Sequence, residues 1–303
     1  MVRGCFFAAG LLSLVTGCVE LGVVTDGTSI SVGKTSGGYL VDGKRLPDKG
    51  EGFLTREVWL ARDNRFGTDE LVELILGVAR RVATQPAVEA EKTPRLVIGD
   101  MSSRHGGSSL ANTAFHRSHQ SGRDADFVYP MRDADGKPLE PDAMHAFDGR
   151  GRSHDKSNVS LDVPRTWALV KELVSAPEAT VQFIFMYEPI ARLVLEHAAA
   201  NGEPPQVIAK ARLALRQPGD SARHDDHMHV RIYCSSTDRE FGCVDFGPME
   251  LYAEREAEHS QLLQLVADVM HPPDRAPRAA ITSSTASLGA RTDRLDLRGW
   301  RIH

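Results

Sequence analysis

Histidine is the residue type that first indicates chemistry in this sequence. The chain has 12 histidines, and several fall in two polar segments, residues 115–127 (FHRSHQSGRDADF) and 223–231 (RHDDHMHVR). Alternate residues of an extended segment face the same side, so His227, His229 and Arg231 would share one face. Two neighbouring imidazoles would repel one another if both were protonated, which favours a shared function over a purely structural role.

Three side chains in these segments have the donor atoms of a catalytic zinc site. Such a site uses three protein ligands and a water, with imidazole nitrogens and carboxylate oxygens among the usual donors. His119, Asp126 and His229 supply this set, and Gly122 allows the chain to turn between the first two. A single histidine is more often a solvated polar residue than a ligand, but the joint pattern predicts one zinc ion.

The composition is that of an ordinary globular protein. Hydrophobic residues make up 41% of the 303 residues and charged residues 25%, which excludes collagen, a coiled-coil rod and wholesale disorder. The length permits one large domain or two modest ones. Because 36 basic residues face 41 acidic ones, the net charge is −5. We therefore expect no nucleic acid among the partners of the chain.

The beginning of the chain indicates export. Residues 1–17 contain one arginine and an apolar run that is too short to span a bilayer and is typical of a signal peptide. The run ends in VTGC, which resembles a bacterial lipobox. We expect cleavage before Cys18, lipidation of Cys18, and a tether over residues 18–28. The alternative is an uncleaved anchor or an ordinary signal peptide.

The other cysteines are consistent with an exported protein. Cys5 lies in the signal peptide, which leaves Cys234 and Cys243 with a short polar loop between them. In an oxidising compartment such a pair predicts a disulfide. A pair of zinc thiolates is the alternative, although no CxxC spacing accompanies it.

Helical and strand patterns follow one another without a regular βαβ rhythm, which predicts an α+β fold. Apolar periodicity predicts helices over residues 69–84, 166–174, 190–200, 207–215 and 250–270, with Thr68 capping the first. Buried or alternating patterns predict strands over 95–101, 181–187 and 227–234, and another beginning at 126. We expect residues 251–303 to form an amphipathic helix and a mobile tail, or else an arm docked on the protein.

The two histidine-rich segments resemble the motifs of the LAS zinc metallopeptidases. More narrowly, residues 118–126 (SHQSGRDAD) and 227–231 (HMHVR) are similar to the penicillin-insensitive murein endopeptidases, and the resemblance extends over about 29–248. It is supported by further segments, among them 37–40 (GGYL), 62–67 (RDNRFG), 104–107 (RHGG) and 183–185 (FIF). The resemblance implies a zinc endopeptidase domain over 29–250, with a small antiparallel sheet flanked by helices.

The resemblance also implies roles for the histidines. His119, Asp126 and His229 become the zinc ligands, and His116 matches a position close to the metal, as a ligand of a second or alternative site. His227 becomes the residue that acts as a base or stabilises the oxyanion.

Other positions follow from the same motifs. His224 is the second catalytic candidate, with Asp225 or Asp226 expected to orient its ring. The Cys234–Cys243 pair also matches a family disulfide. Three residues are expected to shape a groove for a short peptide, with a surface turn as the alternative: Arg104, Gly106 and Gly107.

The sequence departs from the family pattern in two respects. The further cysteines of the family are absent. Residues 153–158 (SHDKSN), where some members place an additional Asp and His metal pair, show no clean match. We therefore expect no well-formed second metal site.

The resemblance implies hydrolysis of the D-alanyl–meso-diaminopimelyl cross-link between peptidoglycan stem peptides by metal-activated water. The enzyme would be a periplasmic lipoprotein, anchored in the outer membrane. One alternative is a non-catalytic, zinc-stabilised lipoprotein that binds the wall, although the presence of His224 and His227 argues against it. The other is a D,D-carboxypeptidase or dipeptidase on the same fold.

Overall fold

The computed structural model describes residues 29–84, 94–108, 117–156, 158–219 and 221–270. The predicted signal peptide, Cys18 and the tether, together with His116 and the predicted tail beyond 270, lie outside the described residues. The chain divides into one unit that ends at His259 and a second that begins at Ser260. Within the described residues, no helix combines the length and the apolar character that crossing a membrane requires.

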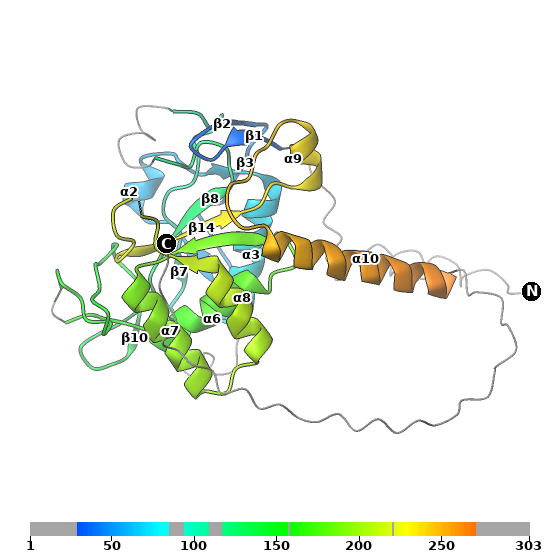
Figure 1. The fold of residues 1–303 in the computed structure, drawn as a ribbon. Coiled ribbons are helices and arrows are strands. Elements are labelled where there is room, and N and C mark those ends of the chain that lie inside the picture. Colours follow the sequence, from blue (N-terminus) through cyan, green and yellow to red (C-terminus); the bar gives the residue numbers. More distant parts are fainter. Residues whose placement is uncertain (1–28, 85–93, 109–116, 157, 220, 271–303) are drawn as a thin grey trace, which may run out of the picture. The chain divides into compact units, whose positions relative to one another are not determined.

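A four-stranded sheet contains the last residues of both histidine-rich segments (Figure 1). Its strands are β8 (Asp124–Val128), β12 (Val181–Phe185), β13 (Leu215–Arg216) and β14 (His227–Ile232), in the order β13-β12-β14-β8. β14 is antiparallel to both neighbours, and β13 is parallel to β12 at one edge. The predicted α+β class is confirmed. The parallel edge strand is a feature that the sequence patterns did not predict.

The two faces of this sheet differ in polarity. On one face, α6 (Val163–Val174) and α8 (Pro205–Ala214) contact β12, while α3 (Asp69–Ala83) and α7 (Glu188–Ala200) pack on α6. Met228 and Val230 are fully buried in the hydrophobic core that these helices share. The alternate residues of β14, which include His227 and His229, therefore occupy the other face.

Local sequence explains where the helices begin. The Thr68 hydroxyl accepts a hydrogen bond from the backbone N–H of Leu71, so the predicted cap of α3 is confirmed. α6 begins three residues earlier than predicted, because the Asp162 carboxylate caps it and Pro164 is compatible with a first helical turn. The predicted long helix is α10, Glu250–Met270.

Smaller elements surround the central sheet. The strand predicted over 95–101 is only two residues long, because it pairs with a two-residue partner. The remaining strands are β1 (Ile30–Lys34), β2 (Gly37–Val41), β3 (Lys44–Arg45), β4 (Lys49–Gly50), β5 (Phe53–Leu54), β6 (Phe66–Gly67), β7 (Leu96–Val97), β9 (Met131–Arg132), β10 (Pro138–Leu139) and β11 (Ser160–Leu161). The short helices are α2 (Glu57–Leu60) and α9 (Ser236–Glu240).

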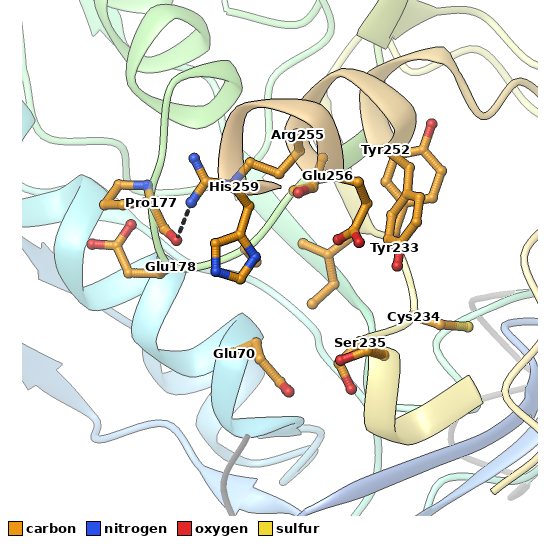
Figure 2. Close-up of a pocket in the computed structure, with 14 residues that line it drawn as sticks. Glu70, Pro177, Glu178, Tyr233, Cys234, Ser235, Tyr252, Arg255, Glu256 and His259 are labelled. Carbon is orange, nitrogen blue, oxygen red and sulfur yellow. Dashed lines mark hydrogen bonds between the residues drawn. The ribbon is translucent and has the colours of Figure 1, made fainter. Parts of the chain in front are cut away.

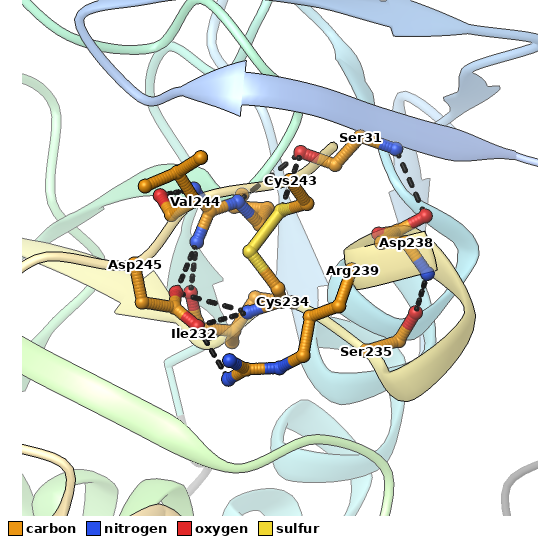
Figure 3. Close-up of a disulfide and its surroundings, with 10 residues drawn as sticks. Ser31, Ile232, Cys234, Ser235, Asp238, Arg239, Cys243, Val244 and Asp245 are labelled. Carbon is orange, nitrogen blue, oxygen red and sulfur yellow. Dashed lines mark hydrogen bonds and ion pairs between the residues drawn. A yellow bond between two sulfur atoms is a disulfide. The ribbon is translucent and has the colours of Figure 1, made fainter. Parts of the chain in front are cut away.

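A disulfide joins Cys234 and Cys243 (Figure 3), as the sequence predicted, so these sulfurs are not zinc ligands. The backbone N–H of Cys234 donates to the Asp245 carboxylate at 3.1 Å. That carboxylate also accepts a hydrogen bond from the buried Arg123 guanidinium at 2.7 Å. Because Arg123 immediately precedes β8, the disulfide-bonded loop is tied to the start of the strand that carries Asp126.

A cavity of about 160 Å³ lies where α10 passes the end of β14 (Figure 2). Glu70, Tyr233 and Glu256 are among the residues that line it. Beside it, Arg255 of α10 donates a hydrogen bond to the backbone carbonyl of Pro177 at 2.9 Å. None of the predicted metal ligands lines this cavity, so it is separate from the site described next.

Candidate metal centre

The three predicted ligands converge in the structure. His119, Asp126 and His229 each offer one ligand atom, and these atoms lie within 4.8 Å of one another. His119 Nε2 is 3.3 Å from Asp126 Oδ1, and His229 Nδ1 is 3.7 Å from the same oxygen. All three residues are buried, at 0%, 1% and 5% exposure. Two imidazoles and one carboxylate in this arrangement could hold a metal ion.

Strand pairing and a tight turn place these residues. His229 on β14 is paired directly with Asp126 on β8, so both side chains project from the same face. His119 lies in the loop before β8 with φ +65°, a conformation that is costly for a residue with a side chain. Gly122 turns the same loop with φ +77°, and its backbone N–H donates to Ser102 Oγ.

Asp124 contacts two of the predicted ligands. One carboxylate oxygen accepts a hydrogen bond from His229 Nε2 at 2.9 Å, and the other accepts from the backbone N–H of His119 at 3.1 Å. Because the proton of the His229 ring is then on Nε2, the lone pair of Nδ1 faces Asp126. Asp124 was not among the predicted site residues, although its position two residues before Asp126 places it on the same strand face.

The charges at the site favour an anionic Asp124 and a neutral His229. Burial alone would raise the pKa of Asp124, but Arg231, whose Nε is 2.7 Å away, and the nearby imidazoles hold that pKa well below its usual value. Burial and the neighbouring His119 lower the pKa of His229 to about 3. A neutral imidazole is the form that binds a metal ion.

His227 is oriented by a carboxylate of its own. Its Nδ1 lies 2.6 Å from Asp226 Oδ1, and its Nε2 is directed into the site, 3.5 Å from Asp126 Oδ1. From the sequence we expected Asp225 or Asp226 to orient His224. Asp226 instead contacts His227, because the two residues are adjacent where β14 begins.

His224 lies beside this group without joining the ligand set. Its ring centroid is 5.2 Å from that of His227 and 5.7 Å from that of His229. Its buried Nδ1 has no hydrogen-bond partner among the described residues. Burial, reinforced by the charge of His227, lowers the pKa of His224 to about 4. The ring is therefore neutral at physiological pH.

The predicted groove residues form a turn that supports the ligand loop. Gly106 has φ +62°, and a Cβ added there would lie 2.1 Å from the backbone oxygen of Gln120. The N–H of Gly107 donates to the same carbonyl at 2.8 Å. Arg104 lies exposed at this turn. Gly106 and Gly107 thus both lie against Gln120, the residue after His119, and this contact gives them a structural role. Their role in binding a peptide stays a prediction.

A second metal group does not occur within the described ranges, in which only His119, Asp126 and His229 are close enough together to hold an ion. His145 uses both ring nitrogens on carboxylates, with Asp155 at 2.8 Å and Asp142 at 3.1 Å. Asp155 therefore contacts His145 and not His154, the histidine that precedes it in the sequence. His116 lies outside the described residues.

The chain was compared with known proteins. The family described as penicillin-insensitive murein endopeptidase matches residues 31–280. A penicillin-insensitive murein endopeptidase of Haemophilus influenzae is 26% identical over 210 residues, which cover 69% of this chain. The matched part spans 65% of the length of that relative.

Proposed function

The chain belongs to the penicillin-insensitive murein endopeptidase family, and on that premise we propose that it hydrolyses peptide cross-links of peptidoglycan. The bond that we propose is the amide between D-alanine and meso-diaminopimelate. The observation that carries the proposal is the buried group of His119, Asp126 and His229, whose ligand atoms lie within 4.8 Å of one another.

The donor set fits one zinc ion. Ligand atoms bound at about 2.0–2.2 Å around a tetrahedral ion lie roughly 3.3–3.6 Å apart. The two imidazole nitrogens lie 3.3 and 3.7 Å from Asp126 Oδ1, and all three ligand atoms lie within 4.8 Å of one another. When bound, zinc would polarise the scissile carbonyl and lower the pKa of its water from 15.7 to about 7. We propose His119, Asp126 and His229 as its ligands, with Asp124 fixing the tautomer of His229.

His227 is proposed as the group that exchanges a proton with the reacting atoms. Asp226 holds its Nδ1, so Nε2 is the atom available beside the ligand group. At Nε2 the ring can take a proton from the attacking water or donate one to the oxyanion. His224, neutral and in ring contact with His227, is proposed as the second catalytic group.

Digestion of cross-linked muropeptide dimers tests the proposed function. The full-length chain, purified in detergent and loaded with zinc, is incubated with dimers, and mass spectrometry identifies the products. We expect dimers to become monomers, and a chelator to stop the conversion. Release of a terminal D-alanine alone would indicate a carboxypeptidase. Binding of dimers without turnover, with about one zinc per chain, would indicate a wall-binding lipoprotein.

Asp124→Asn tests how the ligands are positioned. The amide cannot accept from both the His229 ring and the His119 backbone while balancing Arg231. We expect the affinity for zinc to fall about 10- to 100-fold, measured by competition with a chromogenic chelator. Asp135→Asn, in an exposed turn, is the matched control. Equal zinc affinities of the two variants would refute the role of Asp124.

We also propose that the chain acts at the cell envelope, anchored by a lipid on Cys18. The resemblance of VTGC to a lipobox, the Cys234–Cys243 disulfide and the family membership support this location. Cells that express the full chain are expected to incorporate labelled palmitate into it, and Cys18→Ala should abolish that label. A label that persists in the variant would contradict the anchor.

A further inference from the structure

The face of the sheet that carries the candidate metal centre extends two strands beyond His229. In strand register, one row of residues runs across the four strands through Arg216, Phe185, His229 and Asp126. Residues paired across neighbouring strands project from the same face. Arg216, at the edge of the sheet, therefore projects from the same face as the proposed zinc ligands. Its Cα is roughly 10 Å from the Cα of His229, because two strand spacings separate them.

Two aromatic rings fill the space between Arg216 and the ligand group. The ring of Phe185 meets the ring of His229 edge-on at 5.1 Å, and the ring of Phe183 stacks on Phe185 at 5.1 Å. The guanidinium of Arg216 lies over Phe183, 5.2 Å from its centroid. On the other side, the guanidinium of Arg231 lies 5.0 Å from the centroid of Phe185. Aromatic contact of this kind orients a guanidinium.

The two guanidinium groups differ in their partners. Arg231 donates to Asp124 at 2.7 Å, so a buried carboxylate already balances its charge. Arg216 forms no ion pair with any carboxylate in the part of the chain that the structure describes, and it is only partly exposed. Its backbone is held beside β12, because Arg216 pairs with Phe185 and its carbonyl accepts a hydrogen bond from the N–H of Met186, the residue after β12, at 3.0 Å. The positively charged side chain of Arg216 is therefore held in place on the face of the sheet that carries the candidate metal centre.

We propose that Arg216 binds a carboxylate of the substrate that neighbours the scissile amide, an inference that rests on the proposed function. In the proposed cross-link, the carbon attached to the scissile nitrogen also carries a free carboxylate. That anion stays close to the bond that is cut, and it belongs to the leaving amine. An arginine accepts such a carboxylate through paired N–H groups, so Arg216 would select cross-links in which this group is ionised.

Two dimers that differ in one group test this assignment. One has the free carboxylate beside the scissile amide, and the other has a carboxamide in its place. The zinc-loaded, full-length chain is expected to cleave the first with a kcat/KM about 10- to 100-fold higher, the size of a charge-assisted hydrogen bond. Arg216→Gln should bring the ratio of the two rates close to one, and Arg216→Lys should keep part of the preference. Because both rates come from one preparation, the ratio does not depend on the fraction folded.

Arg192→Gln, on the exposed side of α7, is the matched control and should keep the wild-type ratio. Equal rates on the two dimers for the wild type would overturn the role of Arg216 while the proposed function stands. So would a preference that survives in Arg216→Gln. A wild-type chain that cleaves neither dimer would contradict the proposed function itself, and the assignment of Arg216 with it.

Discussion

His229→Ala is expected to abolish cleavage of cross-linked dimers and to lower the affinity for zinc by more than about 100-fold. Loss of a residue that merely orients a ligand already costs about 10- to 100-fold in affinity, and His229 is one of the three proposed ligands. Its Nδ1 lies 3.7 Å from Asp126 Oδ1 in the buried group, and the methyl side chain of alanine has no donor atom to replace it. Zinc affinity is measured by chelator competition and cleavage by chromatography of the products.

A histidine outside the site provides the control for this variant. His197 lies on α7, where its ring contacts Asn201. His197→Ala should bind zinc and cleave dimers as the wild type does. If His229→Ala retained full zinc affinity, the proposed ligand set would be wrong, whatever the activity of the variant.

His227→Ala is expected to separate catalysis from metal binding. The variant should retain zinc, because His227 is outside the proposed ligand set, and lose about 10²- to 10⁴-fold in kcat, the usual contribution of a positioned acid or base. Zinc content and single-turnover cleavage are measured on the same sample. Asp226→Asn should give a smaller loss, since it leaves the imidazole in place and removes only the carboxylate at Nδ1.

Two results would contradict this role of His227. Loss of zinc together with activity would make His227 a ligand. An unchanged kcat would mean that a group other than His227 exchanges the proton with the reacting atoms. His224, whose ring centroid lies 5.2 Å from that of His227, would be the next residue to test.

The grouping of His119, Asp126 and His229 could be predicted from residue types and spacing, but the contacts that support it could not. The alternation in HMH predicts that His227 and His229 share a face, and the structure has them on one strand. The pairing of His229 with Asp126 is a matter of strand register, which depends on contacts between distant segments. Which carboxylate orients which ring depends on side-chain geometry, so the sequence predicted Asp225 or Asp226 beside His224, whereas Asp226 contacts His227 in the structure.

The fold could be predicted to a similar extent. The long helices have apolar periodicity and caps within the sequence, so α3 and α10 agree with their predicted ranges to within one residue. The two-residue strands lack such a pattern, because only their partners define them. β13 is one of these, and its pairing with β12 brings Arg216 to the face of the ligand group.

Zinc reconstitution of the chelated, full-length chain tests whether cleavage of cross-links depends on one bound metal ion. Aliquots receive increasing amounts of zinc, and the bound metal and the rate of dimer cleavage are measured in each. Our expectation is no cleavage without metal, then a rate that rises in proportion to bound zinc and levels off at one ion per chain. Full activity in the metal-free protein, or one bound zinc with no cleavage of dimers, would contradict it.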